Sequence, residues 1–178
     1  MPQSDTAPPD RQTIRTLLRF AIIMAIVGLL IGVSFQESSK KLPFSEAPAG
    51  IHLESVIHLA LVHGHVFMLG VLMPLAMAGA LVLARKVGGS GVSLLGQRFL
   101  TRGYLSFATL SLVLQLYKGY HVLLMTRAGE RDFAVIDAAY MGGSHLLRYG
   151  VYAVVHTGMG VTLGVFLVLL WRSLKDRS

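Results

Sequence analysis

The chain has 178 residues, of which 53% are hydrophobic and 14% charged, and its formal net charge is +7. This composition is typical of an integral membrane protein and leaves no stretch for a separate soluble domain. The sequence has no cysteine. A structural disulfide, thiolate ligation of an iron–sulfur cluster and C-x-x-C-H attachment of c-type haem are therefore excluded. A redox cofactor would have to be held by histidine, methionine or carboxylate side chains.

The N-terminal residues are polar and contain three prolines before position 10. This composition predicts a disordered cytoplasmic tail over residues 1–15. Residues 16–178 are then expected to form a single four-helix transmembrane domain.

Four apolar stretches follow, and each is close to the length of about 20 residues that a helix needs to cross hydrocarbon. They cover residues 20–36, 55–84, 103–126 and 149–171. Only the third contains a formal charge, on Lys118. The predicted fold is all-α, an integral membrane four-helix bundle.

The connections between these stretches carry turn residues. Residues 40–50 read as an outer loop and residues 87–96, with four glycines, as a flexible inner turn. The third connection, residues 127–144, is predicted to hold a short helix around 133–140 that lies on the membrane surface. Pro74 offers a place for the second helix to bend.

The basic residues predict the orientation of the bundle, because short cytoplasmic segments carry an excess of Lys and Arg. Ten of the sixteen fall on one side: Arg11, Arg15, Arg19, Arg85, Lys86, Arg98, Arg102, Arg172, Lys175 and Arg177. We therefore expect both termini in the cytoplasm (N-in, C-in), most simply in a bacterial inner membrane. This topology accounts for the positive charge, so nucleic-acid binding is not needed to explain it.

The seven histidines are predicted to lie in the outer part of this bundle. Depth can be counted from the inner basic boundary at about 1.5 Å per residue. His63 and His65 then lie about 30 to 33 Å up the second helix, His121 about 28 Å up the third and His156 about 24 Å along the fourth. These four are expected to share a layer, with His52, His58 and His145 above them.

Helical geometry separates the two histidines of the H-x-H sequence. His63 and His65 point in nearly opposite directions, so they cannot bind one ion together from a regular helix. Each therefore needs its own partner. Lys118 and Arg148 are ionisable residues inside spans, which either mark a site or reach outward to the headgroups. Tyr152 lies on one helical stripe with His156.

These residue types suit b-type haem held by two histidines. Such a site needs one inward histidine on each of two helices, small residues where the porphyrin lies, and cations for the propionates. His63 and His156 are the preferred axial pair, with Lys118 or Arg148 at the rim and Tyr152 as an orienting hydroxyl. His65 and His121 would form a second shell or a second site. The sequence leaves the pairing open.

Three motifs carry a resemblance. The second helix reads His63-Gly64-His65-Val66-Phe67-Met68-Leu69-Gly70, and the later motifs are Tyr117-Lys118-Gly119-Tyr120-His121 and Val155-His156-Thr157-Gly158-Met159-Gly160. They resemble an uncharacterised bacterial four-helix membrane family known as a domain of unknown function, with an H-x-H-x-x-x-L-G motif. The first motif is also similar, locally, to haem-ligating helices in the catalytic subunits of haem–copper oxidases and nitric oxide reductases. Four helices cannot contain that twelve-helix subunit, so its reactions do not carry over.

Four functions remain open. The first is a haem-b protein in electron transfer, haem handling or gas sensing. The second is a copper or zinc site built from His63 or His65, His121 and His156 with Met68 or Met159. The third is a zinc hydrolase with Glu54 as general base.

The fourth is a structural accessory subunit of a larger membrane complex. The expected partners are the lipid bilayer, a redox partner or larger complex, and a second copy of the chain. A homodimer would use the small-residue motifs at Gly28 and Gly32 or at Gly160 and Gly164.

Overall fold

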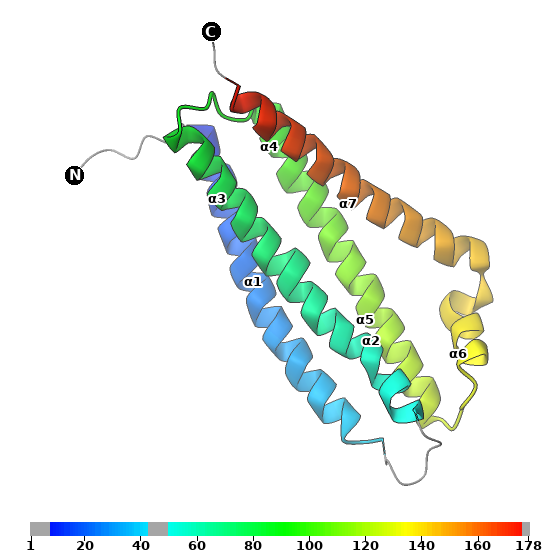
Figure 1. The fold of residues 1–178 in the computed structure, drawn as a ribbon. Coiled ribbons are helices and arrows are strands. Elements are labelled where there is room, and N and C mark those ends of the chain that lie inside the picture. Colours follow the sequence, from blue (N-terminus) through cyan, green and yellow to red (C-terminus); the bar gives the residue numbers. More distant parts are fainter. Residues whose placement is uncertain (1–7, 43–49, 176–178) are drawn as a thin grey trace.

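The computed structural model describes residues 8–42 and 50–175 (Figure 1), and the regular structure in these ranges is entirely helical. Four continuous helical segments are long and apolar enough to cross a membrane: Asp10–Ser39, Ile51–Lys86, Leu94–Arg127 and His145–Ser173. The elements are α1 (Pro8–Ser39), α2 (Ile51–His65), η2 (Val66–Leu72), α3 (Met73–Lys86), α4 (Leu94–Phe99), η3 (Leu100–Tyr104), α5 (Leu105–Arg127), α6 (Phe133–Ala139), η4 (Tyr140–Gly143) and α7 (His145–Ser173). The prediction of an all-α chain with four membrane-length helices is confirmed.

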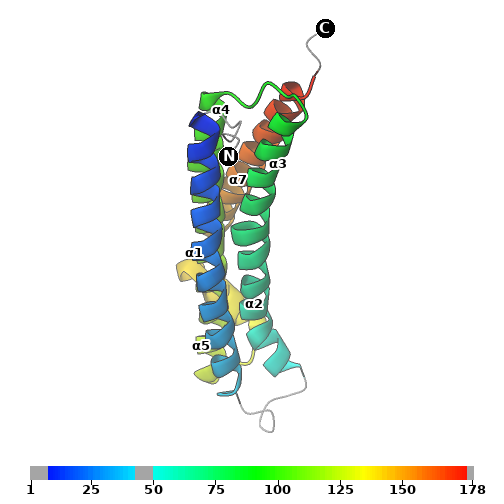
Figure 2. The same cartoon turned by 90° about the vertical axis from the view of Figure 1, so that its left-hand side faces the viewer.

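The four spans run antiparallel. We call the end where α1 begins and α7 stops the inner end, and the end that carries α6 the outer end (Figure 1). The first span packs along the length of α2, η2 and α3 (Figure 2), α2 packs on α5, and α7 packs on η3 and α5. Toward the outer end α7 diverges from α2 (Figure 1), and α6 packs on α5 there.

The first helix begins at Pro8, so the predicted disordered tail over residues 1–15 is wrong for residues 8–15. The reason is an inner-end polar network around Asp10, whose side chain is buried. Its carboxylate accepts hydrogen bonds from Arg85 Nε at 2.8 Å and from Gln97 Nε2 at 2.5 Å. These contacts hold the first turn of α1 against the other spans. Residues 1–7 lie outside the described part.

The third span is longer than predicted. It begins at Leu94 instead of Gly103, because Ser93 caps its first turn by accepting a hydrogen bond from Gly96 N at 3.3 Å. Arg98 and Arg102, taken as markers of the inner boundary, therefore lie on the helix itself. The span also contains a π-helical stretch, Leu100–Tyr104.

The second span holds a longer π-helical stretch, Val66–Leu72, directly before Pro74. Proline lacks a backbone N–H and disturbs the regular helical ladder. The structure thus has a changed hydrogen-bond register before Pro74, and the bend expected there stays a prediction.

The short helix predicted around residues 133–140 is present as α6, followed by the 3₁₀ turn η4. Asp132 caps it by accepting a hydrogen bond from Ala134 N at 2.8 Å. The predicted outer loop at 40–50 falls largely outside the described residues, which omit 43–49.

Glycines set the closest approach of α1 to the second span. A Cβ atom on Gly28 would lie 2.8 Å from the ring of Phe67, and one on Gly32 would lie 2.8 Å from the ring of His63. This first small-residue motif therefore serves packing within the bundle. At Gly160 and Gly164 an added Cβ would meet nothing within 4 Å, so the second motif lies open on α7.

Candidate functional site

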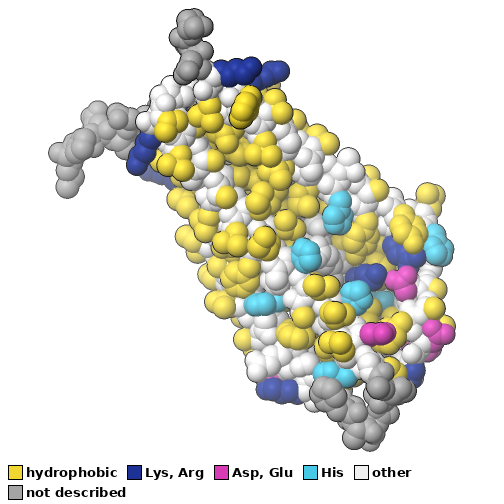
Figure 3. Space-filling model, viewed as in Figure 1, with side chains coloured by type: hydrophobic (Ala, Val, Ile, Leu, Met, Phe, Trp, Pro, Cys, Tyr) yellow, Lys and Arg dark blue, Asp and Glu magenta, His cyan; other side chains and the backbone are white. Residues whose placement is uncertain are grey.

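Histidine side chains gather with acidic side chains toward the outer half of the molecule (Figure 3). Contacts between the helices fix the level of each histidine more closely than counting from a basic boundary does. The level of each histidine is given as the residue of the third span that it faces, because α2 and α7 both pack against this span.

Two contacts set the level of His156. A Cβ atom on Gly103 would lie 2.4 Å from Cγ2 of Thr162, and the Tyr152 hydroxyl donates to the Leu114 carbonyl at 3.2 Å. Interpolation between them along the antiparallel helices places His156 opposite about residue 109 of α5.

Two contacts likewise align the second span with α5. Leu59 packs against Gly119, and Val66 shares an apolar cluster with Leu112. His65 therefore lies opposite about residue 113, which puts it within roughly 6 Å in depth of His156.

The histidines thus form two groups. The middle tier is His63, His65 and His156. The outer tier is His52, His58, His121 and His145 together with Lys118, Asp137 and Arg148. His121 lies about 12 residues, or about 18 Å, farther out than the level of His156. The prediction that His121 shares their layer is wrong, because the third span begins at Leu94 and the count from Arg102 started too late.

His63 lies in the interface between α1 and α2. Its Nδ1 is 2.9 Å from the carbonyl oxygen of Gly28, and its ring packs edge-on against Phe67 with centroids 5.1 Å apart. Gly32 leaves the room that the imidazole fills. His63 is therefore an interhelical hydrogen-bond donor covered by α1.

His65 and His156 share a different arrangement. Both side chains are exposed. The Nδ1 of His65 is 2.7 Å from the carbonyl oxygen of Leu61, and the Nδ1 of His156 is 2.9 Å from that of Tyr152, four residues back on its own helix in each case. A ring nitrogen that faces a carbonyl donates a proton to it, so in the neutral form of both rings Nε2 is the nitrogen without a proton.

The outer tier is organised around Asp137 of α6. Lys118 Nζ lies 3.1 Å from one carboxylate oxygen and Arg148 lies 2.7 Å from the other. Arg148 also donates to the backbone carbonyl of Asp137 at 2.7 Å and approaches His145 Nδ1 at 3.2 Å. The two cations predicted to bind propionates thus have a carboxylate partner inside the chain.

Neighbouring side chains complete this network. His121 donates from Nε2 to the carbonyl of Ile136 at 2.9 Å. The hydroxyls of Tyr140 and Tyr152 lie 3.3 Å apart and both donate to the carbonyl of Leu114. His121 and Tyr152, predicted to bind a cofactor, are engaged here in attaching α6 and α7 to α5.

The electrostatics of Asp137 follow from these contacts. Its partial burial alone would raise its pKa, but the hydrogen bonds and charges of Lys118 and Arg148 outweigh burial and hold the pKa below its usual value. A small pocket of about 190 Å³ adjoins the carboxylate and is lined by Glu54, His58 and Lys118 among others.

Within residues 8–42 and 50–175, no three His, Asp or Glu side chains come together in an arrangement that could hold a metal ion. The zinc-hydrolase and multi-histidine copper hypotheses need three or more protein ligands at one point. The described residues offer at most separate imidazoles.

Comparison of the chain with family models, curated proteins and solved structures finds no match. The function must therefore be argued from the site itself.

Asp137 and Tyr140 are the site residues that sequence reasoning missed. In the sequence Asp137 is only one of several acidic residues in the connection of residues 127–144. Its position on a short capped helix, with two cations inside the neighbouring spans, is the signal that could have identified it.

Proposed function

We propose that this protein is a haem-b-binding integral membrane protein in which His65 and His156 are the axial ligands. One observation carries the proposal: two exposed imidazoles on different helices lie at nearly one level, and each uses Nδ1 for its own backbone. This hydrogen bond is the support that metal-ligating histidines ordinarily have, because it fixes the ring and leaves Nε2 for the metal.

The number of donors favours haem over a bare metal ion. The porphyrin supplies four nitrogen ligands, so the protein needs to supply only two. Zinc needs three or four protein ligands, and the described residues bring no such group together. Burying the imidazoles against a porphyrin would also relieve the cost of exposing polar rings to hydrocarbon.

The revised pair replaces His63 with His65. His63 is already bonded to the Gly28 carbonyl and covered by α1, whereas His65 is exposed. Tyr152 stacks on His156, with ring centroids 5.8 Å apart, and so restricts its orientation. Lys118 and Arg148 could bind the haem propionates only if they gave up part of their ion pairing with Asp137.

A bound haem b would supply reversible one-electron chemistry at iron. If His65 and His156 both held the iron, no coordination position would stay free for a gas, which would favour electron transfer over haem handling or gas sensing. We place the protein in a bacterial inner membrane with both termini in the cytoplasm. The electron donor or acceptor would be a redox partner or larger membrane complex, and Gly160 and Gly164 leave α7 open to a second copy.

Histidine variants test the proposal through the visible spectrum of the purified protein. His65→Ala and His156→Ala should each remove the low-spin haem spectrum. His52→Ala and His121→Ala are the controls and should keep it, because these residues lie nearer the outer end. His63→Ala should lower the yield of folded protein more than the haem content per folded molecule.

Loss of haem in the His121 variant but not in the His65 variant would show that the ligands are in the outer tier. Copper or zinc found by elemental analysis, with no haem, would support the metal alternative. A protein with neither would fit the structural accessory subunit.

A further inference from the structure

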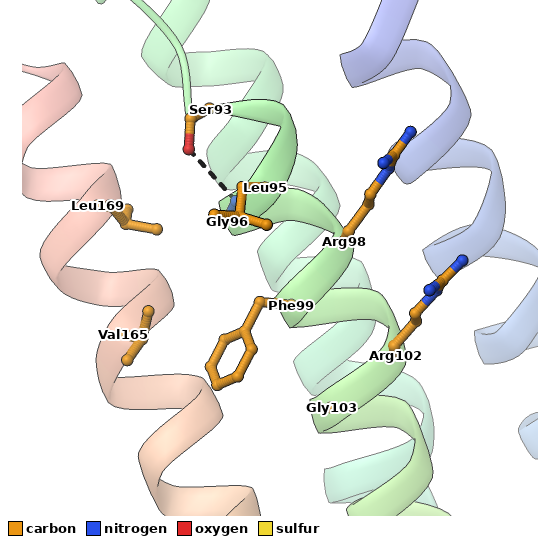
Figure 4. Close-up of a pocket in the computed structure, with 9 residues that line it drawn as sticks. All are labelled: Ser93, Leu95, Gly96, Arg98, Phe99, Arg102, Gly103, Val165 and Leu169. Atoms are coloured by element: carbon orange, nitrogen blue, oxygen red, sulfur yellow. Dashed lines mark hydrogen bonds between the residues drawn. The ribbon is translucent and has the colours of Figure 1, made fainter.

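A pocket at the inner end lies between the start of the third span and α7. It has a volume of about 620 Å³, and its lining includes Leu95, Gly96, Arg98, Phe99, Arg102 and Val165. Figure 4 shows Phe99 pointing toward Val165 on α7, while Arg98 and Arg102 extend from the other side of the same helix.

One wall of this pocket is apolar and open. Leu95, Phe99 and Val165 are 78%, 43% and 38% exposed. Glycine brings the two helices together here, since a Cβ atom on Gly96 would lie 2.4 Å from Cδ1 of Leu169. The residues lie on segments of membrane-spanning length, so the wall is suited to a hydrocarbon chain.

The other side is cationic. Arg98 and Arg102 are four residues apart and therefore share one helix face. Among residues 8–42 and 50–175 neither guanidinium group makes a hydrogen bond or an ion pair, whereas that of Arg85 at the same end is paired with Asp10. Their charges are available to an anion.

A second pocket of about 310 Å³ continues from the two arginines. It is lined by Gln12, Thr13, Thr16, Leu94, Arg98, Thr101 and Arg102, so most of its lining is polar. The apolar and the polar pocket thus share Arg98 and Arg102 as a common border.

We propose that these adjoining pockets bind one anionic phospholipid of the leaflet at the inner end. The phosphate would lie between Arg98 and Arg102, the rest of the headgroup in the polar pocket, and an acyl chain against Phe99 and Val165. Basic pockets between spans on the cytoplasmic side are suited to anionic headgroups. A soluble anion would leave the apolar wall uncovered, which is why an amphiphile is the better occupant.

The test is lipid retention by the detergent-solubilised protein, measured by native mass spectrometry. The probes are dioleoyl phosphatidylglycerol, which is anionic, and dioleoyl phosphatidylcholine, which is zwitterionic. Wild-type protein should retain one phosphatidylglycerol in preference to phosphatidylcholine. The double variant Arg98→Gln with Arg102→Gln should weaken phosphatidylglycerol retention about tenfold or more. Its retention of phosphatidylcholine should not change.

A matched control is Arg15→Gln with Arg19→Gln, which removes two exposed arginines of α1 at the same end and should leave retention unchanged. Val165→Trp should fill the apolar pocket and weaken retention with both arginines present. The proposal fails if the Arg98 and Arg102 variant retains the lipid like wild type. It also fails if the control variant loses the lipid equally, or if inorganic phosphate raises the thermal stability as much as phosphatidylglycerol does.

Discussion

Tyr104 supplies a hydrogen bond that Pro74 cannot make. In a π-helix an N–H bonds a carbonyl five residues back. Met73, at the end of the stretch Val66–Leu72, makes such a bond to the carbonyl of Met68. The next donor in this register would be residue 74, which as proline has no N–H, and its acceptor would be Leu69. The hydroxyl of buried Tyr104 donates to that carbonyl at 3.1 Å. A side chain of the third span therefore donates a hydrogen bond to a carbonyl of the second span that Pro74 leaves without a backbone donor.

Tyr104→Phe should lower the free energy of unfolding by about 1 kcal/mol, because it leaves the Leu69 carbonyl without a donor in an apolar environment. Pro74→Ala restores an N–H, so the same Tyr104 substitution should cost much less in that background. The check is a double-mutant cycle measured by reversible unfolding in mixed micelles. An equal cost of Tyr104→Phe in both backgrounds would rule out this compensation.

Polar contacts attach α6 to the bundle beside its fully buried Ile136. Asp137 joins it to Lys118 of α5 and Arg148 of α7, and the Tyr140 ring lies under Lys118 with 6.0 Å from Nζ to the centroid. Because the pKa of Asp137 is lowered in the folded protein, its charged form is the one that the fold favours. The contribution of the Asp137 carboxylate to the free energy of unfolding is present above its pKa in the unfolded chain. It is lost as pH falls through its pKa in the folded protein.

Asp137→Asn should therefore destabilise the protein at neutral pH, by about 1 kcal/mol since the carboxylate is partly exposed. The difference from wild type should disappear as pH falls below the usual aspartate value of 3.8. Thermal unfolding of both proteins across this range measures it. Asp132→Asn is the matched control, because asparagine also caps a helix. A difference that persists at low pH would mean that Asp137 acts through something other than its charge.

The sequence predicted α6 and the four spans because apolar length, caps and turn residues are local signals. It did not predict the partners of Lys118 and Arg148, since Asp137 reaches them only after the connection folds back. The depth of His121 was misplaced for a related reason. Arg98 and Arg102 were read as a boundary, but their helix continues past them to a serine cap. The tautomers of His65 and His156 depend on side-chain rotamers, which periodicity does not specify.

At the scale of the whole molecule, four antiparallel spans bring both described ends of the chain to the inner end (Figure 1). Arg85, Arg98, Arg102 and Arg172 lie within the inner-end portions of the spans there. Reporter fusions after Ser178 and within residues 87–93 should both give cytoplasmic signals, because the basic side stays in the cytoplasm. A periplasmic signal from either fusion would contradict this topology and place the middle-tier histidines nearer the opposite leaflet.

The central claim is that the bundle holds haem b between His65 and His156. It is tested most directly by the absorption spectrum of the gently solubilised wild-type protein, oxidised and then reduced with dithionite. The proposal predicts a Soret band that shifts on reduction and the sharp α-band of low-spin haem with two histidine ligands. A featureless visible spectrum from protein made in haem-supplied cells would contradict it.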